Sequence, residues 1–263
     1  MTSSSSAEHA QAAYRLRFDW GLSGARALAE NARPGDVAVV VDVLSFTTTL
    51  CVAVEAGIEV HPYPWAAVDA PAYAAARGAT LARGRREGLD TGSVSLSPAS
   101  FEGVTDVERV VLPSPNGSAI AFALADAGVT VLGACLRNAT AVGAWLRAAT
   151  ERISVVAAGE RWPDRELRPA VEDLWGAGAV LTSLGLESAS PEARTAAAAY
   201  DTMRGDLAAA LRACASGREL VGAGFARDVE IAAAVDVAAV VPVLRSEAFV
   251  DGSRSAGART PHA

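Results

Sequence analysis

The chain has 263 residues, of which 51% are hydrophobic and 20% are charged, and its formal net charge is −7. This length and composition are typical of a folded protein of one large or two small domains, which excludes a disordered chain. The negative charge disfavours binding to nucleic acid, so we expect no nucleic-acid partner. No apolar run approaches the roughly 20 residues of a membrane span, so we expect no membrane association.

The first hundred residues alternate short apolar runs with helical segments. Residues 37–43 are almost all apolar and β-branched, which is typical of a strand buried on both faces. In chain order we expect a strand around 14–19, a helix over 22–31, a strand over 37–43, a helix over 46–56, a strand over 58–60, a helix over 66–77 and a strand over 79–82. Residues 84–103 are rich in Gly, Ser and Pro and predict a long loop, a kind of segment that often carries function.

The rest of the chain continues the alternation. In order, we expect a strand over 109–112, a helix over 118–127, a strand over 129–132, a helix over 139–150, a strand over 153–157, a helix over 170–184, a long helix over 191–215, a helix over 226–235 and a strand over 240–244. This order indicates an α/β fold with a largely parallel or mixed sheet layered with helices. We expect a disordered tail over 1–10, one domain over 11–250 that could comprise two intimate α/β subdomains, and a polar tail over 251–263.

Small residue counts exclude several chemistries. Cys51, Cys135 and Cys214 are odd in number and far apart, which fits neither a disulfide framework nor a zinc site. All 23 basic residues are arginine, so no lysine can form a Schiff base or complete a P-loop. Of the three histidines, only His61 lies outside the tails, so a Ser-His-Asp triad has one candidate base. The N-terminus lacks the charge and apolar pattern of a signal peptide, so we expect a cytoplasmic protein.

Polar residues follow the strand over 37–43. Ligands of open α/β sheets bind beyond the carboxyl ends of the strands, where Asp42 lies. Ser45, Thr47 and Thr48 open the next helix, whose free N–H groups suit an anion. In the other interpretation, Asp42 and Ser45 only cap this helix.

Two further strand ends offer hydrogen-bond donors. Asn116, Gly117 and Ser118 follow the strand over 109–112, and Asn138 follows the strand over 129–132. Backbone N–H groups and side-chain amides at such positions can bind an anion. The other interpretation is a turn followed by a helix cap.

A fourth strand end carries acidic residues. Glu160 and Arg161 follow the strand over 153–157, and Glu172 and Asp173 come twelve residues later. Carboxylates without a neighbouring lysine can hold a hard cation such as Mg²⁺. The other interpretation is a solvent-exposed helix face.

The four strand ends together predict a pocket for a small phosphate ester and a magnesium ion. We expect Asp42, Glu160 and Asp173 to act as metal ligands or in acid–base catalysis, with Glu172 as a further metal ligand. The predicted substrate- and phosphate-binding residues are Ser45, Thr47, Thr48, Asn116, Gly117, Ser118, Asn138 and Arg161.

Segments spread in order from about residue 36 to residue 244 resemble motifs of one family, the 2-phosphosulfolactate phosphatase or ComB family. They are Val40-Val41-Asp42-Val43-Leu44 with Thr47-Thr48-Thr49, Leu96-Ser97-Pro98-Ala99, Pro115-Asn116-Gly117-Ser118-Ala119, Leu136-Arg137-Asn138-Ala139, Ala157-Ala158-Gly159-Glu160 with Glu172-Asp173, and Gly224-Phe225-Ala226-Arg227-Asp228-Val229 with Val241-Pro242. The resemblance implies a Mg²⁺-dependent phosphatase that converts 2-phospho-3-sulfolactate to 3-sulfolactate and phosphate.

One position departs from the family pattern. The family usually has Arg-Ala after Asp-Val-Leu, and this chain has Ser45-Phe46. An arginine there would suit a phosphate or sulfonate group, and Arg137 or Arg161 could replace it. Two alternatives therefore stand beside the first hypothesis: a phosphatase of altered substrate specificity, and a non-catalytic anion-binding protein on the same fold. A homodimer is the one protein partner that we consider.

Overall fold

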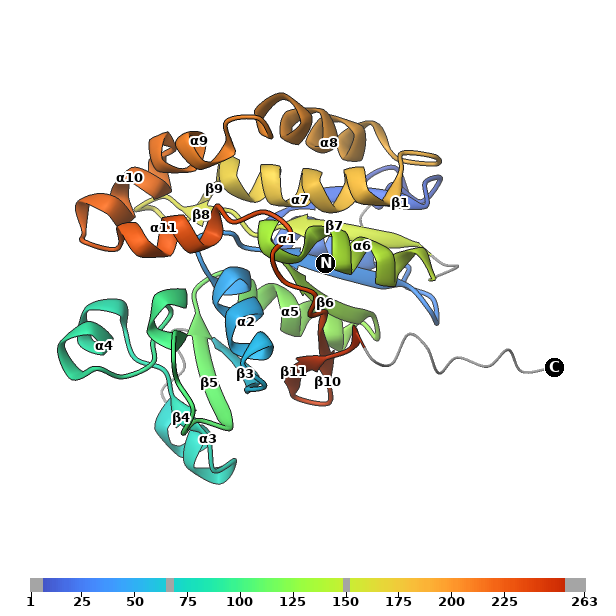
Figure 1. The fold of residues 1–263 in the computed structure, drawn as a ribbon. Helices are drawn as coiled ribbons and strands as arrows, with labels where there is room; N and C mark the ends of the chain where they lie inside the picture. Colours follow the sequence, from blue (N-terminus) through green and yellow to red (C-terminus); the bar gives the residue numbers. More distant parts are fainter. Residues whose placement is uncertain (1–6, 65–68, 149–151, 254–263) are drawn as a thin grey trace.

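The computed structural model describes residues 7–64, 69–148 and 152–253 and confirms the predicted α/β fold. A nine-stranded mixed sheet has the order β1-β7-β2-β6-β10-β11-β3-β5-β4, and β8 and β9 form a separate pair (Figure 1). The strands are β1 Leu16–Trp20, β2 Val37–Val41, β3 Glu59–Pro64, β4 Thr80–Leu81, β5 Arg109–Ser114, β6 Thr130–Ala134, β7 Ile153–Ala157, β8 Glu160–Arg161, β9 Leu167–Arg168, β10 Pro242–Arg245 and β11 Ala248–Asp251.

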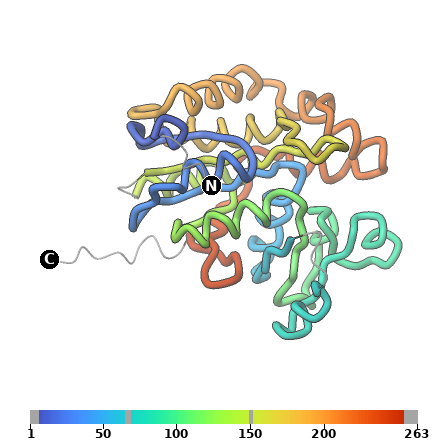
Figure 2. Tube along the Cα trace, turned by 180° about the vertical axis from the view of Figure 1, so that it is seen from behind, coloured from blue at the N-terminus to red at the C-terminus, as the bar shows by residue number. Residues whose placement is uncertain are grey.

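The helices connect the strands and cover both faces of the sheet (Figures 1 and 2). They are α1 Gly21–Ala29, α2 Phe46–Glu55, α3 Ala70–Ala76, α4 Arg85–Thr91, α5 Gly117–Asp126, α6 Ala139–Arg147, α7 Val171–Leu184, α8 Pro191–Met203, α9 Leu207–Ala213, α10 Ala215–Gly222 and α11 Ala226–Ala232, with short 3₁₀ turns η1 Pro98–Phe101 and η2 Leu136–Asn138. Within the described residues, no helix has both the length and the hydropathy of a membrane span.

The sheet consists of two parallel groups joined by a hairpin. Strands β1, β7, β2 and β6 pair in parallel, as do β3, β5 and β4. The β10–β11 hairpin is antiparallel to both groups and meets them at the pairs Val243–Leu132 and Phe249–Val60. The carboxyl ends of β7, β2 and β6 therefore lie side by side, as the placement of a site at these ends requires.

Strand β2 is the centre of the core, and all five of its residues are buried. Because side chains alternate across a strand, Val37, Val39 and Val41 belong to one apolar cluster, with residues of α6, α7 and α8. Ala38 and Val40 belong to a second cluster, with residues of α1, α2 and α5. The prediction of a strand buried on both faces is confirmed.

Several predicted elements differ from the structure. The predicted loop over 84–103 contains α4 and η1, which are too short to show an apolar period. The predicted helix over 191–215 is interrupted at 204–206, where Gly205 disfavours a helix, and α10 follows as a separate helix. The short strands β8, β9 and β11 were not predicted. Residues 66–68 and 149–150 of two predicted helices, and most of both predicted tails, lie outside the described residues.

Candidate active site

Asp42 lies at the carboxyl end of β2 and is held by the first turn of α2. Its Oδ1 accepts the Phe46 N–H at 3.1 Å, and its backbone carbonyl accepts the Thr47 hydroxyl at 2.8 Å. The Asp42 N–H donates to Thr47 Oγ1 at 2.9 Å. The side chain is only 8% exposed, so the chain geometry fixes a nearly buried carboxylate. The Leu44–Ser45 peptide that follows is cis.

Asp173, in the first turn of α7, accepts hydrogen bonds from the segments that follow β2 and β7. Its Oδ1 accepts the Val43 N–H at 2.7 Å, and its Oδ2 accepts the Gly159 N–H at 2.9 Å. Gly159 has a φ of +67°, a conformation that favours glycine, and follows β7. Asp173 and its neighbour Glu172 are both buried. The structure thus brings Asp42, Glu172 and Asp173 to one end of the β2–β7 pair.

Asn116 connects the start of α5 with β8. Its Nδ2 donates to Glu160 Oε2 at 3.1 Å, and its Oδ1 accepts from Arg161 Nε at 3.1 Å. A cavity of about 210 Å³ is lined by Asn116, Glu160 and Arg161 together with Trp20 and Leu167. This cavity is large enough for a small ligand.

Gly117 brings α5 close to Asp42 although β5 belongs to the other parallel group of strands. A Cβ at this position would lie 2.3 Å from Phe46 Cδ1 and 3.0 Å from Asp42 Oδ2, so no larger residue fits without displacing the phenyl ring. The Asn-Gly pair therefore has a packing role next to Asp42.

Burial and mutual repulsion raise the pKa values of the acidic residues here. Burial, with the charge of Glu160, raises the pKa of Asp42 to about 7. Burial, with the charges of Asp42 and Glu172, raises the pKa of Asp173 well above its usual range. Burial also raises the pKa of Glu160, against the opposing charge of Arg168. Such shifts mark carboxylates whose charges the fold does not neutralise.

These carboxylates fit a magnesium ion in their chemistry. Over the described ranges, no three Asp, Glu, His or Cys side chains form a group that could hold a metal ion by themselves. Mg²⁺, however, usually keeps water ligands and takes one or two protein carboxylates with substrate oxygens. Asp42, with Glu160 or Asp173, meets this requirement. Burial and repulsion by neighbouring acids raise the pKa of Asp42, and a bound cation would relieve the repulsion.

Four other predicted phosphate-binding residues are buried, and three of them bond to backbone groups. The Thr48 hydroxyl donates to the Val43 carbonyl at 2.7 Å, and Thr47 bonds to Asp42 as described above. Asn138 accepts the Cys135 N–H at 2.9 Å and donates to the Val240 carbonyl at 3.2 Å. The Ser118 hydroxyl is buried without a hydrogen-bond partner among the described residues. Because Thr47, Thr48, Ser118 and Asn138 have no exposed surface, we leave them out of the proposed binding set.

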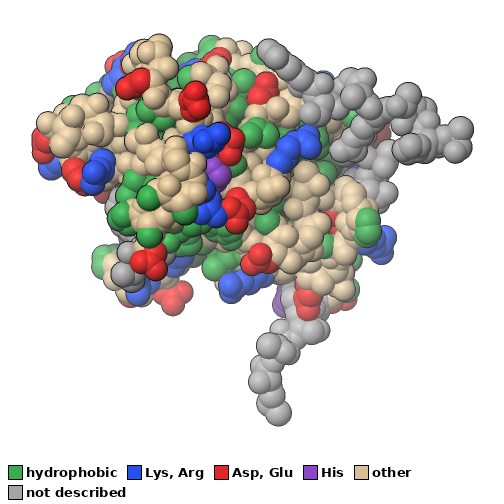
Figure 3. Space-filling view, turned by 90° about the horizontal axis from the view of Figure 1, so that it is seen from below, with side chains coloured by type: hydrophobic (Ala, Val, Ile, Leu, Met, Phe, Trp, Pro, Cys, Tyr) green, Lys and Arg blue, Asp and Glu red, His purple; other side chains and the backbone are tan. Residues whose placement is uncertain are grey.

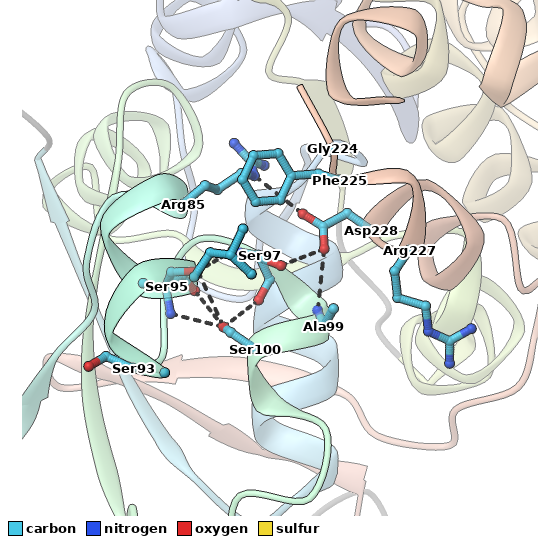
Figure 4. A pocket seen from close by; sticks show the side chains of 13 residues that line it. Arg85, Ser93, Ser95, Ser97, Ala99, Ser100, Gly224, Phe225, Arg227 and Asp228 are labelled. Carbon is cyan, nitrogen blue, oxygen red and sulfur yellow. Dashed lines mark hydrogen bonds and ion pairs between the residues drawn. The ribbon is translucent and has the colours of Figure 1, made fainter. Parts of the chain in front are cut away.

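Arg85, which the sequence analysis did not single out, lies beside Ser45. Its Nη2 donates to Ser45 Oγ at 2.6 Å. Its Nε donates to Asp228 Oδ2 at 3.3 Å (Figure 4). The two arginines considered as replacements bond elsewhere: Arg137 to Glu55, and Arg161 to Asn116. The signal that could have found Arg85 is its place at the start of the polar segment over 84–103, which was expected to carry function.

Charged side chains elsewhere are mixed. On the face seen from below in Figure 3, acidic and basic side chains are interspersed. Among the pairs that the structure describes, Arg77–Glu247 and Arg227–Glu102 join exposed or partly exposed groups of opposite sign. Pairs of this kind contribute little to stability.

Known proteins resemble the chain over most of its length. A family model described as 2-phosphosulpholactate phosphatase matches residues 25–247. A probable 2-phosphosulfolactate phosphatase of Deinococcus radiodurans is 32% identical over 219 residues, which cover 80% of this chain and 88% of that protein. Proteins of the same description from Gloeobacter violaceus and Thermus thermophilus are 32% and 33% identical over 79% and 80% of this chain, and over 87% and 88% of their own lengths.

Proposed function

Because the chain belongs to the 2-phosphosulpholactate phosphatase family and is thus a phosphoric monoester hydrolase, we propose that its substrate is 2-phospho-3-sulfolactate and that it requires Mg²⁺. The products would be 3-sulfolactate and phosphate. The observation that carries the proposal is the group of acids at these strand ends, in which Asp42 and Asp173 are buried and the partly buried Glu160 accepts from Asn116.

In this proposal Asp42, with Glu160 or Asp173, holds the magnesium ion. When bound, the ion neutralises charge on the phosphoryl oxygens and lowers the pKa of a water ligand. Asp173 is oriented by the Val43 and Gly159 N–H groups and cannot rotate freely. Asp42, by contrast, lies at the start of α2, and its Oδ1 accepts the Phe46 N–H.

Asn116 and Arg161 lie where they can bind the phosphoryl group. Both side chains carry N–H donors, and the planar guanidinium of Arg161 suits the oxygens of a phosphate group. Glu160 lies next to Asn116, where a carboxyl group could transfer a proton to the departing alkoxide as water replaces it on phosphorus and the ester P–O bond breaks. The cavity beside these three residues would hold the phosphoryl end of the ester.

The proposal is tested by phosphate release from a panel of small phosphate esters, first with Mg²⁺ and then with excess EDTA. We expect release in Mg²⁺, its loss in EDTA, and recovery when Mg²⁺ is restored. A panel in which no ester gives metal-dependent release contradicts the proposal. If anions bind tightly in calorimetry without turnover, the chain is an anion-binding protein on this fold.

A second candidate function is a phosphatase that acts on a different ester. It is favoured by Ser45, which stands where the family usually has arginine. Ser45→Arg separates the two candidates, because the substrate profile should change only if position 45 selects the substrate. A cytoplasmic location and a homodimer stay predictions.

A further inference from the structure

A second cavity is lined by Arg85, the side chain that donates to Ser45. Its volume is about 270 Å³, and its lining includes Arg85, Ser95, Ser97, Phe225 and Asp228. The lining residues come from α4, from the segment around η1 and from the start of α11 (Figure 4). Its size is below the 300 to 1,000 Å³ of sites for drug-sized ligands, so it suits a small molecule.

The guanidinium of Arg85 is held by Asp228. Asp228 is 1% exposed, and its Oδ1 accepts the Ser97 hydroxyl and the Ala99 N–H. Its Oδ2 accepts Arg85 Nε at 3.3 Å. Three donors from the protein bond to this buried carboxylate, and one of them is Arg85, so we infer that Asp228 positions Arg85.

Arg85 itself keeps donors free. A guanidinium has five N–H groups, and the described hydrogen bonds use one on Nε and one on Nη2. The remaining N–H groups belong to Nη1 and Nη2 of a side chain that is 22% exposed and lines the cavity. An arginine with a fixed Nε and free Nη groups is prepared to bind a planar carboxylate or a tetrahedral sulfonate.

The cavity is also close to the proposed reaction centre. Ser45, which accepts from Arg85, is three residues from Asp42 in the same turn. The Phe46 N–H that follows Ser45 donates to Asp42 Oδ1 at 3.1 Å, so Arg85 contacts the turn that holds Asp42. An anionic group bound by Arg85 would therefore lie next to the turn between β2 and α2 that holds Asp42.

We propose that Arg85 binds the second, non-reacting anionic group of the substrate, a sulfonate or a carboxylate, while the phosphoryl group lies at Asp42, and that Asp228 positions Arg85 for this contact. The inference rests on the proposed function. It also accounts for Ser45 at the position where the family usually has arginine, since a guanidinium from α4 occupies the space beside it.

The experiment compares wild type with Arg85→Gln and Arg85→Lys on four esters: 2-phospho-3-sulfolactate, 2-phospholactate without the sulfonate, the phosphate ester of 2-hydroxyethanesulfonate without the carboxylate, and isopropyl phosphate with neither. We expect Arg85→Gln to lower kcat/KM roughly 10- to 100-fold for esters that carry the recognised anion, mainly through KM, and to leave isopropyl phosphate unchanged. The two single-anion esters show whether sulfonate or carboxylate is recognised. Arg85→Lys keeps the positive charge but not the planar pair of N–H donors, so its kcat/KM should fall less than that of Arg85→Gln.

The matched control is Arg227→Gln. Arg227 lines the same cavity, but it pairs with Glu102 and Glu230 and points away from Arg85 in Figure 4. It should leave all four kcat/KM values within about twofold of wild type, since it takes no part in the proposed contact. Thermal unfolding of each variant shows whether the fold is kept.

Calorimetric titration with 3-sulfolactate, which lacks phosphate, tests the same contact without turnover. Arg85→Gln should weaken this binding by the same factor, and Arg227→Gln should not. An equal loss on all four esters, or unchanged 3-sulfolactate binding in a folded Arg85→Gln, overturns the inference. If wild type hydrolyses none of the esters, the proposed function fails, and the titration alone decides whether Arg85 binds the anion.

Discussion

Strand β2 has a buried aspartate at each end, and the two aspartates have different neighbours. Asp36, just before the strand, is 2% exposed, and Asp42, just after it, is 8% exposed. Asp36 accepts Arg152 Nη2 at 2.6 Å and the Arg33 N–H at 3.0 Å. Asp42 accepts the Phe46 N–H and lies near the negative charge of Glu160.

The pKa values of the two acids move in opposite directions. Burial alone would raise the pKa of Asp36, but the hydrogen bonds and charge of Arg152 and the Arg33 N–H lower it. Burial and the charge of Glu160 raise the pKa of Asp42 to about 7. Both residues have little exposed surface, but their surroundings differ: Arg152 and the Arg33 N–H outweigh burial at Asp36, whereas at Asp42 burial is the largest cause of the raised pKa and the like charge of Glu160 adds to it. The fold neutralises the acid at one end of β2 and not the acid at the other, where the proposed function places the ligand.

Asp42→Asn should have the largest effect, on activity. The loss of a metal ligand or acid–base group is expected to lower kcat by roughly 10² to 10⁴. Stability should be unchanged or higher, because the substitution removes a carboxylate that its acidic neighbours repel. Phosphate release and urea unfolding check the two statements. A variant that keeps its turnover, or that unfolds, would place Asp42 among the structural residues with Asp36.

Asp36→Asn should show the reverse pattern. Breaking a buried ion pair leaves Arg152, whose side chain is 12% exposed, without its charged partner, at a cost of about 3 kcal/mol in the free energy of unfolding. The kcat/KM value should stay within about twofold of wild type, because Asp36 lies at the opposite end of the strand. The matched control is Arg152→Met in both backgrounds, since the two substitutions together should cost less than their sum.

The sequence was enough to predict Asp42 but not its contrast with Asp36. The run over 37–43 contains the buried strand and therefore its carboxyl end, where a ligand is expected. The partner of Asp36 is 116 positions away in the chain, and the partners of Arg85 are 40 and 143 positions away. No local period encodes such contacts, so Arg85 and Asp228 could be found only in the structure. Local pattern likewise could not show that the Thr48 hydroxyl and the Asn138 amide are buried and bond to backbone groups.

The smallest expected effect is on the pH dependence of the free energy of unfolding. Asp36 and Asp42, at the two ends of β2, should change it with opposite sign. Asp36 has a lowered folded pKa, so its stabilising effect is complete above its unfolded value of 3.8 and is lost as the pH falls through the folded value. Asp42 has a folded pKa of about 7, so its ionisation destabilises the protein fully above pH 7, and this cost is relieved as the pH falls from about 7 toward 3.8.

Urea unfolding in EDTA between pH 3 and pH 8 measures both effects. The stability gained by Asp42→Asn relative to wild type should be largest above pH 7 and should shrink steadily toward pH 4. The stability lost by Asp36→Asn should be constant from pH 5 to pH 8 and should shrink only below pH 4. Two parallel profiles would mean that the environments of the two acids are alike, and the division of β2 into a neutralised end and a ligand-binding end would then be wrong.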